Sequence, residues 1–186
     1  MIPSTLAVSL YIESLISWSK VRLPIDEANR FGIRQTTLNG FLQSSANTAG
    51  VPANAYNLTE DSARRIYSWY LLNAVPHFNI QHLKRLKTAL QLSHIAAMFG
   101  HDAAARTLQR SLLNLATATV TVNGKLDKTT IDLIETVNPH FLTGRIFTQW
   151  ILLVDGYCSS LEREAFRLDW IRRAVAISYE DLEIGN

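Results

Sequence analysis

The stretch His94-Ile-Ala-Ala-Met98-Phe-Gly100-His-Asp-Ala-Ala-Ala-Arg-Thr-Leu108-Gln109 contains the end of one apolar segment and the beginning of another. Apolar residues recur at helical spacing through the first segment, namely Leu83, Leu86, Leu90, Ala97 and Met98. Gly100 suits the left-handed backbone that ends many helices, and Asp102 offers an N-cap for a helix over 103–116. The stretch therefore predicts two consecutive helices, with the preceding segments packed on the first helix and the following segments on the second.

Length and composition are those of a globular protein. The chain has 186 residues, of which 47% are hydrophobic and 18% are charged, so it can bury a core in a single compact body. A formal net charge of +2 gives a weak long-range field, which does not favour nucleic acid as a partner. Cys158 is the only cysteine, so an internal disulfide is excluded, and its neighbours are typical of a helical core.

The N-terminal segment and the apolar runs indicate where the chain is made. Glu13 interrupts the first apolar run and no basic leader precedes that run, so we expect no cleaved signal peptide. No stretch approaches the ~20 apolar residues that a membrane span requires. We therefore expect synthesis in the cytoplasm and no membrane span, and export by a route without a signal sequence stays open.

The rest of the chain is predicted to be helical, with one exception. The expected helices cover about 4–20, 35–43, 59–75, 79–99, 127–137, 141–157 and 160–178, with N-caps at Thr59, Asn79 and Asp127. Turn-forming residues over 44–54 indicate a surface loop. Asn123-Gly124 is a tight-turn signal between two short extended arms, which predicts one small β-hairpin near residues 119–126. The predicted fold class is therefore mainly α with this hairpin.

Several short motifs resemble, in order, those of the glycoside hydrolase family 108 muramidases, which are lysozyme-like helical proteins. The resemblance covers roughly Leu6 to Val175 and rests on Gly32-Ile33-Arg34 with Thr37-Leu38, Ile66-Tyr67 with Asn73-Ala74-Val75, Ala104-Ala-Arg-Thr-Leu108-Gln109, Val122-Asn123-Gly124-Lys-Leu126 with Thr130, and Phe166-Arg-Leu-Asp-Trp170-Ile-Arg-Arg173. It implies a lysozyme-like fold, with a muramidase-like region over 1–116. Residues 117–186 then resemble the family's peptidoglycan-binding region, packed with the first region as one body.

The residues that match the family's catalytic motif have changed. The family carries its catalytic glutamate in a Glu-Gly-Gly motif before Pro-x-Asp, and Pro24-Ile25-Asp26 places Ser17-Trp18-Ser19 at that motif. A hydroxyl cannot protonate a glycosidic oxygen near neutral pH because it holds its proton too tightly. The resemblance therefore implies that the general acid is missing at Ser17.

Other positions of the implied cleft have also lost their polar or aromatic character. The match places Leu71 and Leu72 where the family has Tyr-Trp, and it places His94 and Met98 where the family has Asp and Asn. The loop that begins at Asp26 is shorter than the family's Asp-Pro-Gly-Gly loop. These changes predict a degenerate cleft, in which the side chain of Trp18 can fill the former groove. The residues of this predicted cleft are Ser17, Trp18, Asp26, Leu71, Leu72, His94 and Met98.

Glu13 is the alternative candidate for the acid. It lies four residues before Ser17, on the same helix face but ~6 Å away along the axis, so it would need a rebuilt site. Metal binding is not favoured, because no companion cysteines or one-turn spacing accompany His77, His82, His94 and His101. No metal or other cofactor is therefore predicted.

Two functions from different classes follow from these residues. The first is a catalytically degenerate muramidase-like protein that binds peptidoglycan or protein subunits, as a structural component of a phage particle or another envelope-penetrating assembly. The alternative is an active peptidoglycan muramidase, similar to an endolysin, that uses a displaced acid such as Glu13. Position 17 favours the first, so we expect a pseudoenzyme, and a regulator that binds nucleic acid is not favoured.

Overall fold

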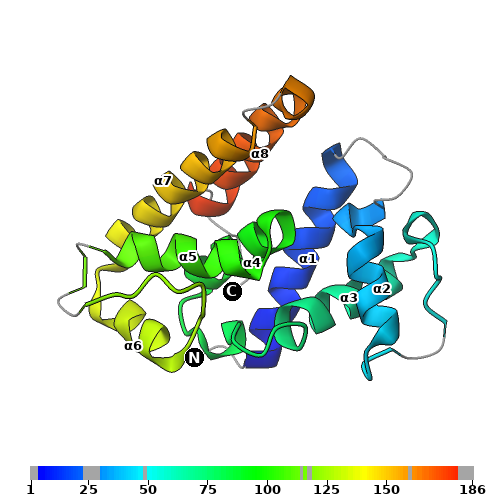
Figure 1. Ribbon diagram of the computed structural model, residues 1–186, viewed down its shortest axis with the longest axis horizontal. Helices are drawn as coiled ribbons and strands as arrows, with labels where there is room; N and C mark the ends of the chain where they lie inside the picture. The colour runs from blue at the N-terminus through cyan, green and yellow to red at the C-terminus, as the bar shows by residue number, and fades with distance from the viewer. Residues whose placement is uncertain are drawn as a thin grey trace. The chain divides into compact units, whose positions relative to one another are not determined.

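The computed structural model describes residues 4–22, 30–47, 50–113, 115–116, 119–158 and 161–179. Within these ranges it has eight α-helices, three short 3-10 helices and no β-strand (Figure 1). The prediction of a mainly α fold is confirmed. Across the described ranges, no helix combines the length and the apolar character needed to cross a membrane. The chain divides into two compact units, residues 1–82 and residues 83–186, and the division at residue 116 that the resemblance implies stays a prediction.

The first unit contains α1 (Ser4–Arg22), α2 (Gln35–Gln43) and α3 (Glu60–Leu72), with short turns η1 (Arg30–Gly32), η2 (Ala55–Asn57) and η3 (Ile80–His82). Helix α3 packs against both α1 and α2. One face of each helix supplies the core, in which these side chains are at most 2% exposed: Tyr11, Leu15, Ile16, Leu38, Phe41, Ile66 and Leu71. The core therefore follows the apolar spacing of the three helices.

Two polar side chains hold the segments that connect these helices. Gln35 donates from Nε2 to the carbonyl of Ala53 at 2.8 Å and accepts at Oε1 from the amide of Ala55 at 2.9 Å. The hydroxyl of Tyr67 donates to the carbonyl of Phe31 at 2.7 Å. Phe31 has a positive φ of 57°, a conformation that costs a side-chain-bearing residue ~1–2 kcal/mol, so Tyr67 fixes a strained point of the chain.

The second unit is built around α4 (Leu86–Phe99), in which every residue from Thr88 to Ala96 is buried. Helices α5 (His101–Leu112), α7 (Pro139–Tyr157) and α8 (Leu161–Tyr179) pack against α4, and α6 (Lys128–Thr136) packs against α5. Helices α7 and α8 lie side by side (Figure 1). The sequence predicted that the segments after residue 109 would pack on α5. In the structure, α7 and α8 also pack on α4.

Two predicted N-caps are confirmed. The hydroxyl oxygen of Thr59 accepts from the amide of Ser62 at 3.2 Å at the start of α3. The carboxylate of Asp127 accepts from the amide of Thr130 at 2.9 Å at the start of α6. Each side chain satisfies an amide that has no partner within its own helix, which fixes where the helix begins.

Two other predicted helix starts are wrong, and a third helix begins two residues before its approximate predicted start. Asn79 does not cap the central helix, because Ile80–His82 forms a separate turn that buries Ile80 and α4 begins at Leu86. Gly100, at φ 93° and ψ 163°, itself precedes α5, so Asp102 lies in the first turn of that helix rather than at its cap. Helix α7 begins at Pro139 because proline is tolerated in the first turn and Asn138 supplies the cap.

The predicted β-hairpin near residues 119–126 is also wrong. Its turn is present, since Gly124 has a positive φ of 78°, but its two arms form no strands. The physical reason lies in α5, where Arg106 and Gln109 bind the backbone groups around the turn. The segment is therefore a loop docked on a helix.

Candidate functional site

Helix α1 carries Ser17 and Trp18, the residues that the resemblance places at the catalytic motif. The preceding residues Leu15 and Ile16 are at most 1% exposed in the core, whereas Ser17 is exposed and Trp18 is half-buried. Successive side chains of a helix point in different directions, so Ser17 lies on the exposed face of α1 although Leu15 and Ile16 are buried. A serine there can offer a hydrogen bond but no acidic proton.

Glu13 lies on the same exposed face and is bound to Arg64 of α3. Nε of Arg64 donates to Oε1 of Glu13 at 2.6 Å, and Nη2 donates to Oε2 at 3.0 Å. The same Nη2 donates to Glu60 at 2.5 Å. These hydrogen bonds, first to Glu13 and then to Glu60, raise the pKa of Arg64. A carboxylate held by a guanidinium is favoured in its ionised form, which is the opposite of what a general acid needs.

The other residues predicted for the degenerate cleft lie within the two units as follows. Leu71 is 1% exposed in the core of the first unit, and Leu72 beside it is half-buried. His94 is fully buried in the second unit, and Met98 is half-buried near the end of α4. Asp26 lies outside the described residues. Leu71 and His94 thus serve the packing of their own units, and the cleft itself stays a prediction.

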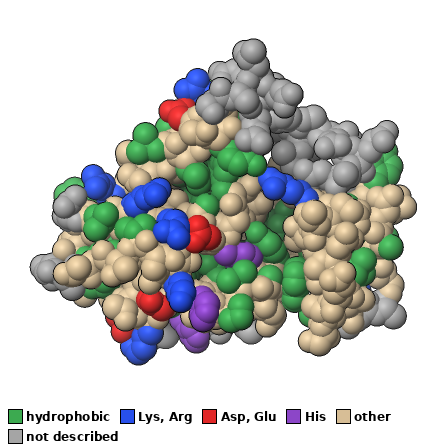
Figure 2. Space-filling view, viewed as in Figure 1, with side chains coloured by type: hydrophobic (Ala, Val, Ile, Leu, Met, Phe, Trp, Pro, Cys, Tyr) green, Lys and Arg blue, Asp and Glu red, His purple; other side chains and the backbone are tan. Residues whose placement is uncertain are grey.

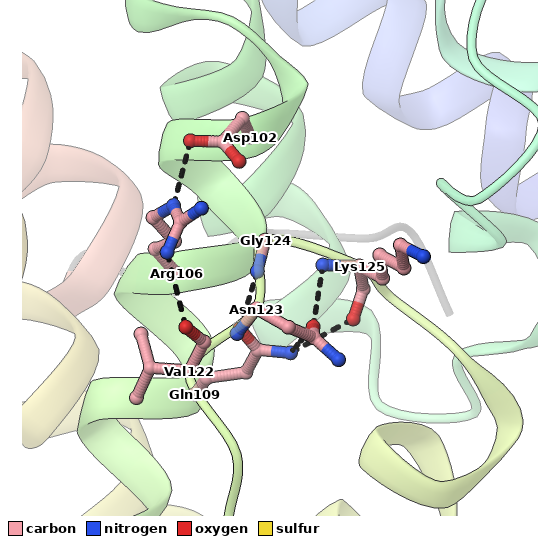
Figure 3. Close-up of polar contacts among 7 residues, drawn as sticks. All are labelled: Asp102, Arg106, Gln109, Val122, Asn123, Gly124 and Lys125. Carbon is pink, nitrogen blue, oxygen red and sulfur yellow. Dashed lines mark hydrogen bonds and ion pairs between the residues drawn. The ribbon is translucent and has the colours of Figure 1, made fainter.

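A polar centre that the sequence analysis did not find joins α5 to the loop over 122–125 (Figure 3). Its main member is Gln109, which is fully buried. Oε1 of Gln109 accepts from the backbone amides of Asn123 at 3.0 Å and Gly124 at 2.9 Å. Nε2 donates to the carbonyl of Lys125 at 2.9 Å and to Oδ1 of Asn123 at 2.7 Å. One side chain therefore replaces the ladder that a hairpin would have formed.

Arg106 and Asp102 extend this centre along α5 (Figure 3). Nε of Arg106 donates to Oδ2 of Asp102 at 2.8 Å, and Nη1 donates to the carbonyl of Val122 at 3.0 Å. The hydrogen bond that Arg106 donates to Asp102 raises the pKa of Arg106. A Cβ on Gly124 would meet the carboxylate of Asp102, so an alanine there would displace this exposed side chain and would also strain the positive φ of the backbone.

The sequence held one indirect signal for this centre. The motif that ends in Gln109 and the motif that contains Asn123-Gly124 both belong to the resemblance. Nothing in their separation along the chain says that they touch, because a loop can leave its flanking helices in many directions. The contact between the two motifs is therefore a finding of the structure.

Several charged side chains on the surface form ion pairs within their own helix. Lys128 and Asp132 of α6 meet at 2.6 Å, and Figure 2 shows Lys and Arg interspersed with Asp and Glu on the face in view. In the part of the chain that the structure describes, no group of three His, Cys, Asp or Glu side chains is arranged to hold a metal ion.

Comparison with known proteins identifies a similar fold. The chain is similar to the solved structure of SagA from Brucella abortus, with a TM-score of 0.66 and 16% sequence identity. The likeness covers 95% of this chain and 98% of the SagA chain. At this identity the likeness concerns the fold alone. No protein-family model matches the chain, and no curated protein matches it by sequence.

Proposed function

We propose that this chain is a muramidase-like protein that has lost its general acid and acts by binding. In this proposal it is a peptidoglycan-binding or structural component of an envelope-penetrating assembly such as a phage particle. The proposal takes the family from the resemblance of the sequence motifs. The similar fold of SagA over nearly the full length of both chains supports the fold on which the proposal is built.

The observation that carries the proposal is the state of the two candidate acids on α1. Ser17 stands where the resemblance puts the catalytic glutamate, and its side chain is exposed. Glu13, the substitute, is bound by both the Nε and the Nη2 of Arg64. Glycoside hydrolysis needs a protonated carboxyl group beside the leaving oxygen. Neither residue supplies one, which supports binding rather than hydrolysis.

Contacts in the second unit agree with the motif assignment. The Leu-Gln motif and the Asn-Gly turn, which the resemblance takes from separate places in the chain, are joined by the hydrogen bonds of Gln109. These contacts give both motifs a structural role that does not depend on the catalytic position, which supports the proposal of a fold without its reaction.

The test is incubation of the purified chain with insoluble peptidoglycan, followed by mass spectrometry of the supernatant and by sedimentation of the pellet. We expect no released muropeptides and retention of the protein in the pellet. Glu13→Gln is the matched variant, because it removes the negative charge and keeps the size of the side chain. Its circular dichroism and thermal midpoint show whether the fold is intact.

Three outcomes separate the possible functions. Retention without cleavage, unchanged in Glu13→Gln, supports a peptidoglycan-binding protein. Muropeptide release by the original chain contradicts the proposal, and loss of that release in a folded Glu13→Gln variant identifies the alternative enzyme. A chain that neither cuts nor binds supports the structural role, with protein subunits as its partners.

A further inference from the structure

A buried polar cluster joins α4 to α7 and α8 in the second unit. Nε of Arg173 on α8 donates to Nδ1 of His94 on α4 at 2.7 Å. His94 is 0% exposed and Arg173 is 8% exposed. One turn earlier on α4, Nε2 of Gln91 donates to Oγ of Ser178 at 2.8 Å and to the carbonyl of Thr143 at 3.2 Å. These polar contacts therefore help to hold α8 on α4 inside a largely apolar interior.

The contact with Arg173 determines the protonation state of His94. A guanidinium can only donate hydrogen bonds, so Nδ1 must offer a lone pair and the imidazole is neutral with its proton on Nε2. Protonation of Nδ1 would remove the acceptor and place a second positive charge against the guanidinium in a buried site. Burial and then the charge of Arg173 lower the pKa of His94 well below 6.5.

The surroundings of His94 identify Arg173 as the charged group that acts on it. From α7, the uncharged ring of Trp150 lies with its centroid 6.5 Å from the imidazole. From α5, His101 is the second buried histidine. The other charged or titratable side chains described on α5, α7 and α8 are exposed or engaged in ion pairs or ring contacts, namely Asp102, Arg106, Arg110, His140, Arg145, Asp155, Tyr157, Arg167, Asp169, Arg172 and Tyr179.

Hydrogen bonding in this cluster is incomplete. Within the described residues, Nε1 of Trp150 and Oε1 of Gln91 are buried and have no hydrogen-bond partner. Buried polar groups without partners weaken the packing that contains them, because they give up their hydration without compensation. The interface between α4 and its neighbours is therefore sensitive to the loss of a further hydrogen bond.

We propose that the contact between His94 and Arg173 is an acid-operated latch, which holds α8 on α4 while His94 is neutral and releases α8 when His94 is protonated. In the unfolded chain the imidazole titrates near 6.5, above its value in the folded unit. The stability that depends on neutral His94 is thus complete above this pH. This stability is lost as the pH falls below 6.5. For each pH unit, the equilibrium constant between docked α8 and released α8 falls by up to about tenfold.

The test is amide hydrogen exchange of the full chain at about pH 7.5 and about pH 5.5, corrected for intrinsic exchange rates. We expect the protection of α8 to fall by up to about tenfold at the lower pH, while α3 in the first unit keeps its protection. In His94→Gln, which keeps an acceptor oxygen but cannot take up a proton, the protection of α8 should not depend on pH. His140→Gln, on the exposed face of α7, should behave like the original chain.

Several results would overturn the latch. These are an unchanged protection of α8 at the lower pH, the same loss in His94→Gln, or removal of the loss by His101→Gln. If His94→Gln does not fold, nitrogen-15 NMR of the histidines in the original chain decides the question. The latch requires the Nε2-protonated tautomer of His94 at neutral pH and titration below 6.5, and a His94 that titrates at 6.5 or above excludes it.

Discussion

The side chain of Gln109 and the backbone of Gly124, 15 residues apart, are joined by a hydrogen bond of 2.9 Å from the glycine amide to Oε1. Gln109 also binds Asn123 and the carbonyl of Lys125 (Figure 3). Buried backbone groups need partners, and here Gln109 supplies most of them, while Arg106 binds the carbonyl of Val122. The position of the loop on α5 therefore depends mainly on Gln109.

Replacement of Gln109 by methionine should destabilise the second unit by ~2–4 kcal/mol, because several polar groups of the loop lose their partners while the volume is kept. Urea unfolding followed by circular dichroism measures the change. Arg110→Ala alters the next residue of α5, which is exposed, and should change the free energy of unfolding by less than ~0.5 kcal/mol. A Gln109→Met variant as stable as this control would show that the loop does not need the glutamine.

Gly124→Ala should cost more than Gly50→Ala. Both glycines have positive φ, 78° and 94°, so alanine strains the backbone at each by ~1–2 kcal/mol. A Cβ at Gly50 has no atom within 4 Å, whereas a Cβ at Gly124 meets Asp102. In thermal unfolding, the double variant Asp102→Ala/Gly124→Ala should lose less stability than the sum of the single changes. If the losses of stability in the two single variants add up in the double variant, the side chain of Asp102 moves away from the new Cβ at no cost in stability.

The helices and some of their ends were predictable because local residues determine them. Thr59 and Asp127 cap helices by bonding amides three residues away, a distance that the sequence shows directly. The prediction of a hairpin was wrong because the partners of its two arms are not determined locally. Asn123-Gly124 specifies a turn, but the partners of its arms were decided by Gln109 on another element.

The candidate site was less predictable because its contacts join distant parts of the chain. Arg64 is 51 residues from Glu13, and Arg173 is 79 residues from His94. Each sequence position could be assigned to a helix face, but many partners on other helices would have suited it. The pairing that makes Glu13 a poor acid, and the one that keeps His94 neutral, therefore emerge only from the packing.

Replacement of Tyr11 by phenylalanine should reduce the loss of stability that the first unit suffers at alkaline pH. Tyr11 is 2% exposed, and burial raises its pKa from 10.0 to about 12. Because the folded state holds the phenolic proton more tightly than the unfolded chain, the stability from neutral Tyr11 is complete below pH 10.0 and lost as the pH rises towards about 12. Urea unfolding across this range should show a loss that is ~1–2 kcal/mol smaller in Tyr11→Phe than in the original chain. Burial also raises the pKa of Tyr70 in the first unit, and the loss that Tyr70 causes should remain in the variant. Tyr56→Phe, at a residue 47% exposed, should keep the full loss, and an equal loss in Tyr11→Phe would assign the alkaline transition to other groups.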